Sequence, residues 1–229
     1  MLTFGEPEAE DNFAHLQTFA PNAKRIDGVE GLLNAHKACA EESNTKYFYV
    51  CDADAWIQPN FQFKFEPSNT KEAYPGVKET ECVFTYRSHN PINDLIYGYG
   101  AVKLFPKRNL LDVKEFKVDM TTSIGAKFKP LFEISNVTAF NTDPFNTWRS
   151  AFRECTKLAS GIVDHNKQTD DSYRLEVWCE RGDNRKYGEY ALLGAQQGRD
   201  FGTHYKNNVE ALRRINDWNW LKETFSEAL

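Results

Sequence analysis

The chain has 229 residues and a formal net charge of -5. Hydrophobic residues make up 41% of it and aromatic residues 14%, which is enough for a packed core and excludes wholesale disorder. The acidic balance excludes a protein that coats nucleic acid by charge alone, although it is compatible with a local basic face.

Membrane segments and cysteines indicate the compartment. No apolar run approaches the roughly 20 residues needed to span a bilayer, and the first residues lack the basic start and long apolar stretch of a signal peptide. The five cysteines are odd in number and form no CxxC pair, which is typical of reduced thiols and not of a disulfide framework or a zinc site. We therefore expect a cytoplasmic protein without a membrane-bound segment.

Strands and helices alternate in the first fifty residues. The patterns predict strands at residues 1–4 and 24–26, helices at 9–19 and 31–42, and a buried parallel strand at 47–51. This β-α-β-α-β order predicts an open, mostly parallel α/β sheet.

The rest of the chain carries further strands and then helices. Strands are predicted at residues 61–65, 81–87, 95–97 and 101–105. The segment 109–138 is loop-rich and ambiguous. Helices are predicted at residues 147–158, 170–180, 188–197 and 209–225. We therefore expect one compact α/β domain with a helical C-terminal third.

Two aspartates follow the buried strand at residues 47–51. Asp52 and Asp54 are separated by the small residue Ala53, and ligands of open α/β sheets bind at the carboxyl ends of the strands. In an extended segment residues two apart point to the same side, so both carboxylates are expected to face one hard cation. Oxygen ligands suit Mn²⁺ or Mg²⁺, which would offset the charge on a departing diphosphate. The alternative is an acidic turn after a strand.

The residues from Gly31 to Phe61 resemble the core of GT-A fold glycosyltransferases. They contain a helix rich in small residues with Asn34 near its start, a strand ending in Asp52-Ala53-Asp54, and then Pro59 and Phe61. With the motifs Tyr-Gly-Tyr-Gly at 97–100, Lys-Leu-Phe-Pro at 103–106 and Asn-Thr-Asp-Pro-Phe-Asn-Thr-Trp-Arg at 141–149, nearly the whole chain resembles small glycosyltransferases of tailed bacteriophages. The resemblance implies a single Rossmann-like GT-A domain over residues 1–229. Its halves would be a nucleotide-sugar-binding half at 1–105 and an acceptor-side half at 106–229.

The resemblance also implies a donor site for a nucleotide-diphosphate sugar, with a UDP-sugar as the expected donor. Gly5-Glu6-Pro7 would border the base, Asp27 would contact base or ribose, and Asn34 would lie near the ribose or diphosphate. Asp54, together with Asp52, would hold Mn²⁺ or Mg²⁺, and Asp52 would also contact the donor. Asp27 is alternatively a turn residue, and Asn34 the solvated start of a helix.

Inverting members of this fold need a carboxylate that deprotonates the acceptor hydroxyl. In the family it is often the Asp of a Glu-Asp pair with an Arg some six residues later. Asp143, followed by Arg149, fits that spacing but has Thr142 in place of the Glu, so Asp143 is the expected base. The alternative is that Asp143 only initiates the next helix, because Asp before Pro favours turn initiation. The fallback candidates for the base are Glu133, Glu154 and Glu189.

The roles of the histidines and tryptophans are predicted separately. Several members of the fold return a C-terminal His to the metal, which implies His204, on a predicted Gly-containing loop, as a metal ligand. A structural or solvated His204 is the alternative. His36 is expected to pack or to lie on a helix surface. Tryptophans are core residues by default, and Trp148 is a candidate for the wall of an acceptor pocket.

The resemblance to phage enzymes suggests hydroxymethylated pyrimidines in DNA as the acceptor. Independently, residues 103–129 hold seven basic residues: Lys103, Lys107, Arg108, Lys114, Lys117, Lys127 and Lys129. A basic, loop-rich surface there would suit contacts to phosphates. A flipped-out base would stack on Tyr97, Tyr99 or Phe105.

Other classes of function compete with this hypothesis. A glycosyltransferase with a protein, lipid-linked or small-molecule acceptor is one alternative, and a non-catalytic nucleotide-sugar-binding protein is another. A sugar nucleotidyltransferase normally opens with a Gly-rich, basic loop, whereas residues 5–11 are acidic with one glycine. Gly98-Tyr99-Gly100 lacks the third glycine of a dinucleotide fingerprint, which excludes an oxidoreductase of that kind.

Overall fold

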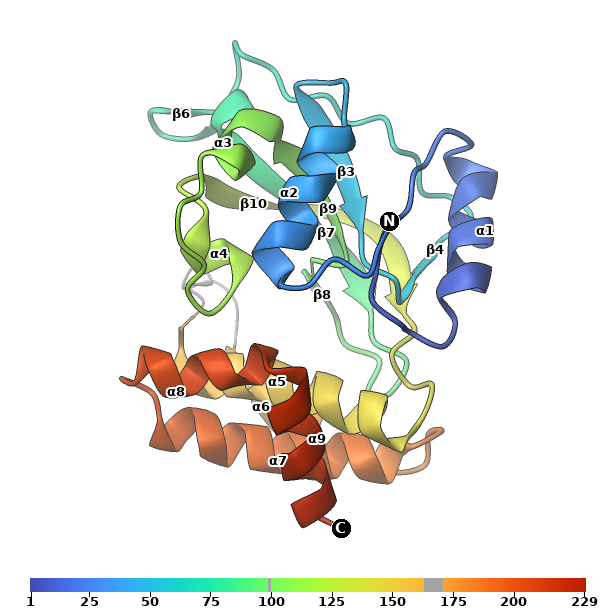
Figure 1. The fold of residues 1–229 in the computed structure, drawn as a ribbon, viewed down its shortest axis with the longest axis vertical. Coiled ribbons are helices and arrows are strands. Elements are labelled where there is room, and N and C mark those ends of the chain that lie inside the picture. The colour runs from blue at the N-terminus through green and yellow to red at the C-terminus, as the bar shows by residue number, and fades with distance from the viewer. Residues whose placement is uncertain (99, 163–170) are drawn as a thin grey trace. The chain divides into compact units, whose positions relative to one another are not determined.

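A computed structural model describes residues 1–98, 100–162 and 171–229 (Figure 1). The chain divides into two compact units. The first, called the sheet unit, comprises Met1–Asn90, Ile96–Phe116 and Ser123–Ala139. The second, called the helical unit, comprises Pro91–Leu95, Lys117–Thr122 and Phe140–Leu229. The single-domain organisation predicted for residues 1–229 stays a prediction, because each unit is described by itself.

The sheet unit opens with the predicted alternation of strands and helices. Its elements are β1 (Leu2–Thr3), α1 (Ala9–Phe19), β2 (Ile26–Asp27), α2 (Leu32–Glu42) and β3 (Tyr47–Cys51). β1 and β2 pair in parallel, and an isolated parallel bridge joins Leu2 to Asp52 just after β3. β1 therefore lies between β2 and the end of β3. The mixed α/β class is confirmed.

The main sheet has six strands in the order β3-β9-β7-β10-β4, and β8 pairs with β7. The added strands are β4 (Ala55–Ile57), β7 (Cys82–His89), β8 (Ile96–Tyr97), β9 (Val102–Pro106) and β10 (Lys127–Thr138). Only the pairing of β7 with β10 is parallel. A mostly parallel, Rossmann-like sheet is therefore not confirmed, because antiparallel pairings dominate.

The connection that follows β7 explains this difference. The chain turns back along β7 as β8 and then β9, both antiparallel to it, with no helix between β7 and β9. A parallel neighbour would have required a long crossover, usually a helix. Because β9 is inserted in reverse between β3 and β7, β1, β2, β3, β7 and β10 still share one direction.

The predictions for two segments of the sheet unit are wrong. Residues 61–65 form no strand; their rings pack on the core, and the backbone N–H of Phe65 donates to the Tyr49 hydroxyl at 3.1 Å. Residues 109–138 are not mainly loop, since they contain the whole twelve-residue strand β10. Pro130 cannot donate a ladder hydrogen bond, and the register of β10 shifts directly after it, which hides the strand in the sequence. The smaller elements are β5 (Glu72–Tyr74), β6 (Val77–Lys78), η1 (Glu79–Glu81), α3 (Lys107–Leu111) and α4 (Met120–Ser123).

The helical unit confirms the predicted helical C-terminal third. Its elements are α5 (Pro144–Ser160), α6 (Asp171–Glu180), α7 (Gly188–His204), α8 (Val209–Arg213), η2 (Arg214–Asn216) and α9 (Trp218–Glu227). The prediction of one continuous helix over residues 209–225 is wrong. The Asp217 carboxylate accepts hydrogen bonds from the backbone N–H groups of Asn219 and Trp220, and a new helix, α9, therefore starts there.

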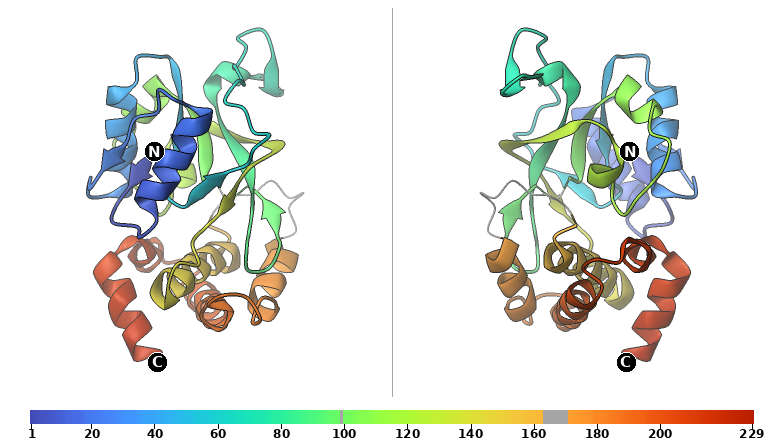
Figure 2. Two further views of the ribbon diagram at one scale, coloured as in Figure 1. Left: turned by 90° about the vertical axis from the view of Figure 1, so that its right-hand side faces the viewer. Right: turned by 90° about the vertical axis from the view of Figure 1, so that its left-hand side faces the viewer.

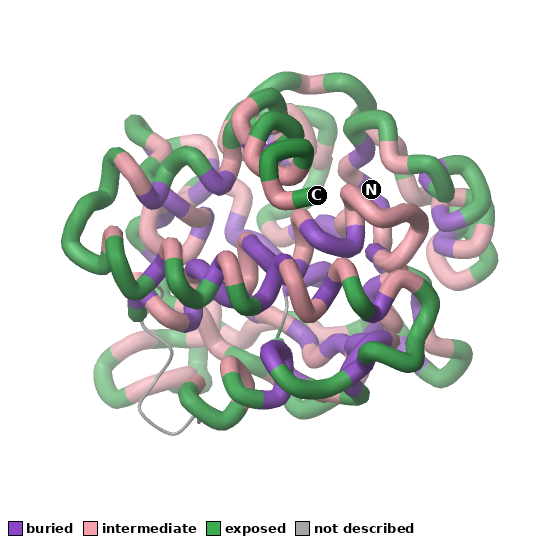
Figure 3. The backbone as a smooth tube through the Cα atoms, turned by 90° about the horizontal axis from the view of Figure 1, so that it is seen from below, coloured by how far each residue is buried: buried purple, intermediate pink, exposed green. Residues whose placement is uncertain are grey.

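Helices α5 and α7 run side by side (Figures 1 and 2). Gly194, Gly198 and Gly202 lie on successive turns of α7, and a Cβ atom at any of them would overlap a backbone carbonyl oxygen of α5. Buried residues recur along these helices turn by turn (Figure 3). Trp148 and Trp178 are both fully buried, 0% and 1% exposed, so the expectation that Trp148 lines an acceptor pocket is wrong and its default core role is confirmed.

Candidate functional site

The carboxyl ends of β1, β2 and β3 meet at one edge of the sheet unit. From β1 the chain passes through α1 to β2 on one side, and then through α2 to β3 on the other side. Such a reversal of strand order is a topological switch point, and open α/β sheets bind ligands outside the strand ends at that point. Three of the predicted site segments lie at these strand ends. Asp27 is the last residue of β2, Asp52 directly follows β3, and Gly5-Glu6-Pro7 lies in the loop after β1.

Asp27 is anchored to the end of β1. The Thr3 hydroxyl donates a hydrogen bond to the Asp27 carboxylate, and Arg25 lies 3.4 Å from the same oxygen. Chiefly because of the Thr3 hydrogen bond, with a smaller contribution from Arg25, the pKa of Asp27 lies below its ordinary value. The side chain is 57% exposed. Asp27 is thus an ionised, fixed acceptor at the sheet edge and more than a turn residue.

The loop after β1 and the start of α2 border this edge. Gly5 has a φ of 78°, a conformation that favours glycine, and the Glu6 carboxylate accepts the backbone N–H of Phe4 at 2.6 Å. The Asn34 amide donates to the carbonyl of Glu30 at 3.1 Å, so Asn34 occupies the helix start that was its alternative role. Donor contacts of Gly5, Glu6, Pro7 and Asn34 stay predictions.

The aspartate pair lies in a tight turn. The backbone N–H of Ala55 donates to the carbonyl of Asp52 at 3.1 Å, so the segment is not extended and the alternation expected for Asp52 and Asp54 does not apply. The buried Asn12 amide of α1 donates to the Ala53 carbonyl at 2.7 Å. The backbone N–H of Ala139 donates to the Asp54 carbonyl at 2.7 Å. Contacts from distant parts of the sheet unit therefore fix this turn.

Asp52 is paired with a lysine of the reversed strand β9. The Lys103 ammonium lies 3.1 Å from both carboxylate oxygens of Asp52, and their side chains are 13% and 40% exposed. Lys103 was expected on a basic acceptor surface, and the structure places its ammonium against Asp52 at the carboxyl end of β3. The charge of Asp52 is thereby compensated.

A metal ion at the turn stays a prediction. Among the described residues no group of three or more His, Cys, Asp or Glu side chains is arranged to hold a metal ion. Asp54, partly exposed beside the neutralised Asp52, is suited to a different type of site. Mg²⁺ typically binds through one or two carboxylates and completes its shell with water and phosphate oxygens.

Asp143 is the N-cap of α5 in the helical unit. Its carboxylate accepts the backbone N–H of Asn146 at 2.8 Å, the Asn146 amide at 2.6 Å and the Thr142 hydroxyl at 3.2 Å. The alternative role as a helix start is therefore what the structure shows, and the role as base stays a prediction. Of the fallback residues, Glu154 pairs with Lys157 at 3.1 Å, and Glu133 and Glu189 are exposed.

His204 does not lie on a loop. It is the exposed last residue of α7, with its ring 4.5 Å from that of Tyr205. Gly202, which suggested a loop, lies inside α7, where a Cβ atom would overlap the Thr156 carbonyl oxygen of α5. His36 is 1% exposed and packs edge-on to Phe105. Of its two expected roles, a packed residue or a helix-surface residue, the structure shows the packed one.

The predicted basic acceptor surface stays a prediction. Its residues are spread over several elements: Lys107 donates to the Ser43 carbonyl at 2.7 Å, and Lys127 and Lys129 lie over the Tyr74 ring. Phe105 is 0% and Tyr97 5% exposed, so neither ring is available to stack on a flipped base. Tyr99 lies outside the described residues.

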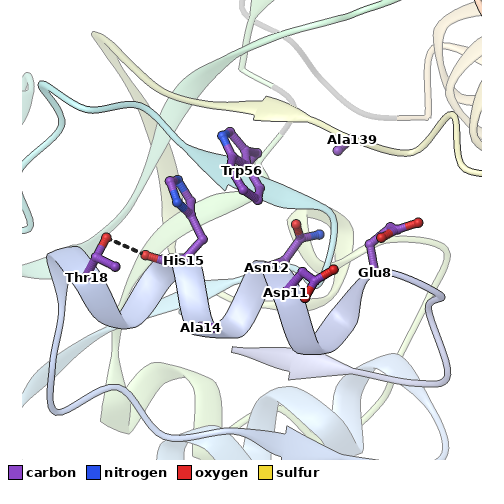
Figure 4. Close-up of a pocket in the computed structure, with 8 residues that line it drawn as sticks. All are labelled: Glu8, Asp11, Asn12, Ala14, His15, Thr18, Trp56 and Ala139. Carbon is purple, nitrogen blue, oxygen red and sulfur yellow. Dashed lines mark hydrogen bonds between the residues drawn. The ribbon is translucent and has the colours of Figure 1, made fainter.

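One feature of the sheet unit was missed by sequence reasoning. An open groove of about 620 Å³ runs between α1 and β4 (Figure 4), and its lining residues are Glu8, Asp11, Asn12, Ala14, His15, Thr18, Trp56 and Ala139. Trp56 was assigned to the core by default, yet it is 42% exposed between the buried Ala55 and Ile57. The sequence signal that could have indicated a surface role for Trp56 was its position two residues after Asp54.

Comparison of the chain with protein-family models, with curated proteins and with solved structures finds no match. Among the described residues, no helix combines the length and apolar character needed to cross a membrane.

Proposed function

We propose that the sheet unit binds a nucleotide-diphosphate sugar, with a UDP-sugar as the expected donor, and transfers the sugar with the help of Mn²⁺ or Mg²⁺. The observation that carries this proposal is the position of the Asp52-Ala53-Asp54 turn at the switch point between β1 and β3. Strand ends at such a point are where nucleotides bind in open α/β sheets.

Charge at the turn favours a diphosphate over a simple cation site. Two carboxylates next to a diphosphate would repel it, but Lys103 compensates Asp52. Asp54 would hold the divalent cation, whose positive charge would offset the charge that develops on the departing diphosphate. Lys103 would keep the local charge from becoming strongly negative when that diphosphate leaves.

Asp27 supplies the second polar contact of the proposed donor site. Its carboxylate is held by Thr3 at the end of the neighbouring strand and is kept ionised by that hydrogen bond. An ionised carboxylate accepts hydrogen bonds only. It would therefore select donor groups of the nucleoside, such as ribose hydroxyls or a base N–H.

Nucleotide binding is the first test, because it needs no acceptor. Titration calorimetry with UDP, GDP, CDP and ADP in the presence of Mn²⁺ should give binding of at least one nucleotide. Asp54→Asn should weaken that binding and abolish the slow hydrolysis of the matching nucleotide-sugar. Asp112→Asn, an exposed aspartate on the same unit that pairs only with Arg108 at 3.7 Å, is the matched control and should leave both unchanged. No binding of any nucleotide by the wild-type chain would overturn the proposal.

The same experiments separate catalysis from binding alone. Nucleotide binding without hydrolysis or transfer of any donor would favour a non-catalytic nucleotide-sugar-binding protein. The DNA acceptor stays a prediction, and hydroxymethylated DNA belongs in the acceptor panel with unmodified DNA as its control. Formation of a nucleoside adduct, detected by mass spectrometry, is the result that would establish it.

Asp143→Asn tests the predicted base without removing the helix cap. Asn is as good an N-cap residue as Asp, so the variant should keep its stability. If Asp143 deprotonates the acceptor, turnover should fall by roughly 10²–10⁴-fold with unchanged nucleotide affinity. An unchanged rate would leave Asp143 with its capping role only.

A further inference from the structure

The groove between α1 and β4 presents one aromatic face that is fixed in place. The Trp56 ring stacks on His15 with a centroid distance of 3.7 Å and an interplanar angle of 6°. His15 is held in turn, because its Nε2 lies 2.8 Å from the Ile57 carbonyl oxygen and its ring packs edge-on to Phe19. His15 covers one side of the indole, and the other side is directed toward Ala139 and the groove (Figure 4).

Polar groups surround this aromatic face on the side of α1. Glu8 and Asp11 lie near the start of α1, and both are exposed. Figure 4 shows both side chains at the start of α1, near Asn12. An indole face with adjacent carboxylates matches a pyranose, since the weakly positive C–H bonds of a sugar face meet the negative face of an aromatic ring. The hydroxyls at the sugar's edge are donors to carboxylate oxygens.

The groove shares its backbone with the aspartate turn. Asn12 lines the groove and donates to the Ala53 carbonyl, and Ala139 lines it and donates to the Asp54 carbonyl. Trp56 follows Asp54 by two residues. A ligand in the groove would therefore lie against the segment that holds the proposed donor site.

We propose that this groove binds a neutral saccharide, with Trp56 as the stacking platform and Glu8 and Asp11 as hydroxyl acceptors. Resting on the proposed function, this saccharide is the acceptor of the transferred sugar. The chemistry of the groove thus favours a carbohydrate acceptor.

Saccharide binding is tested without nucleotide or metal. Saturation-transfer NMR is recorded with a panel of glucose, galactose, mannose, N-acetylglucosamine, cellobiose and lactose, together with tetramethylammonium as a cationic probe. At least one saccharide should bind the wild-type chain, and Trp56→Ala should weaken that binding by more than about 10-fold. Phe132→Ala is the matched control, because Phe132 is 82% exposed on β10 and does not line the groove; it should bind like the wild type.

A second variant guards against loss of folding. Glu8→Gln with Asp11→Asn changes only exposed side chains, so the circular dichroism spectrum should be unchanged while saccharide affinity falls. The proposal is overturned if no saccharide binds, if Trp56→Ala binds as well as the wild type, or if only tetramethylammonium binds. Nucleotide binding should persist in Trp56→Ala. A chain that binds saccharide but no nucleotide therefore refutes the proposed function and the acceptor role that rests on it, and leaves the groove as a saccharide site.

Discussion

The two units use small and polar residues in opposite ways. In the helical unit, Gly194, Gly198 and Gly202 let two helix backbones touch, and the polar residue Asp143 caps a helix. In the sheet unit, Asp27, Asp52 and Asp54 lie at strand ends and remain partly or largely exposed. The helical unit is thus organised around backbone contact, whereas the sheet unit keeps polar groups exposed at the carboxyl ends of its strands.

Aromatic residues show the same contrast. In the helical unit Trp148 stacks on Phe152 within a buried cluster. In the sheet unit Trp56 stacks on His15 at the surface. Stacking of the first kind contributes to stability, and stacking of the second kind orients a ring that solvent still reaches.

The largest effect is expected from breaking the contact between α5 and α7. Gly198→Val places a branched side chain where a Cβ would already overlap the Phe152 carbonyl oxygen. The helices must separate, which should destabilise the helical unit by at least about 3 kcal/mol. Urea unfolding followed by circular dichroism measures the loss. Gly125→Ala, where a Cβ would meet no atom within 4 Å, should unfold like the wild type, and equal midpoints for both variants would contradict the close packing.

A smaller effect is expected from Asn12→Ala in the sheet unit. The substitution leaves the Ala53 carbonyl without the 2.7 Å hydrogen bond from a side chain that is 3% exposed, which should cost about 1–3 kcal/mol. Because that bond fixes the aspartate turn, nucleotide affinity should fall as well. Asn219→Ala, at an exposed position of α9, should change neither quantity. If Asn12→Ala is destabilised but binds nucleotide with normal affinity, the aspartate turn is not part of the donor site.

Removal of a helix cap should have an effect of about 1 kcal/mol. Asp143→Ala and Asp217→Ala each delete a carboxylate that accepts backbone N–H groups at a helix start. Thermal unfolding should show similar losses for both, while Asp143→Asn stays close to the wild type. A loss of several kcal/mol in Asp143→Ala alone would indicate that Asp143 does more than cap α5.

The smallest effect concerns the ionisation of Asp27. Thr3→Val removes the hydroxyl that chiefly lowers the pKa of Asp27, so that pKa should rise toward its ordinary value. A lowered pKa in the folded chain contributes stability above the unfolded pKa, and this contribution is lost as pH falls through the folded value. Carboxyl-detected NMR titration measures the shift. An unchanged Asp27 pKa in Thr3→Val would assign the effect to Arg25 instead.

The sequence by itself determined the local elements and one chemical motif. The bounds of α1 and β3 coincide with the predicted ones, because hydrophobic periodicity and turn residues act over only a few neighbouring positions. The same local reasoning placed Asp52 and Asp54 directly after a buried strand.

Only the tertiary structure decided what surrounds that motif. Lys103 reaches Asp52 across 51 positions because β9 returns in reverse beside β3, and a reversed strand carries no local signal that distinguishes it from a parallel one. Gly202 was taken for a loop residue because its role depends on the facing helix. Trp56 stays at the surface because β4 is an edge strand whose outer side α1 covers only in part. Contacts between segments distant in the sequence set all three, and such contacts exist only once the chain has folded.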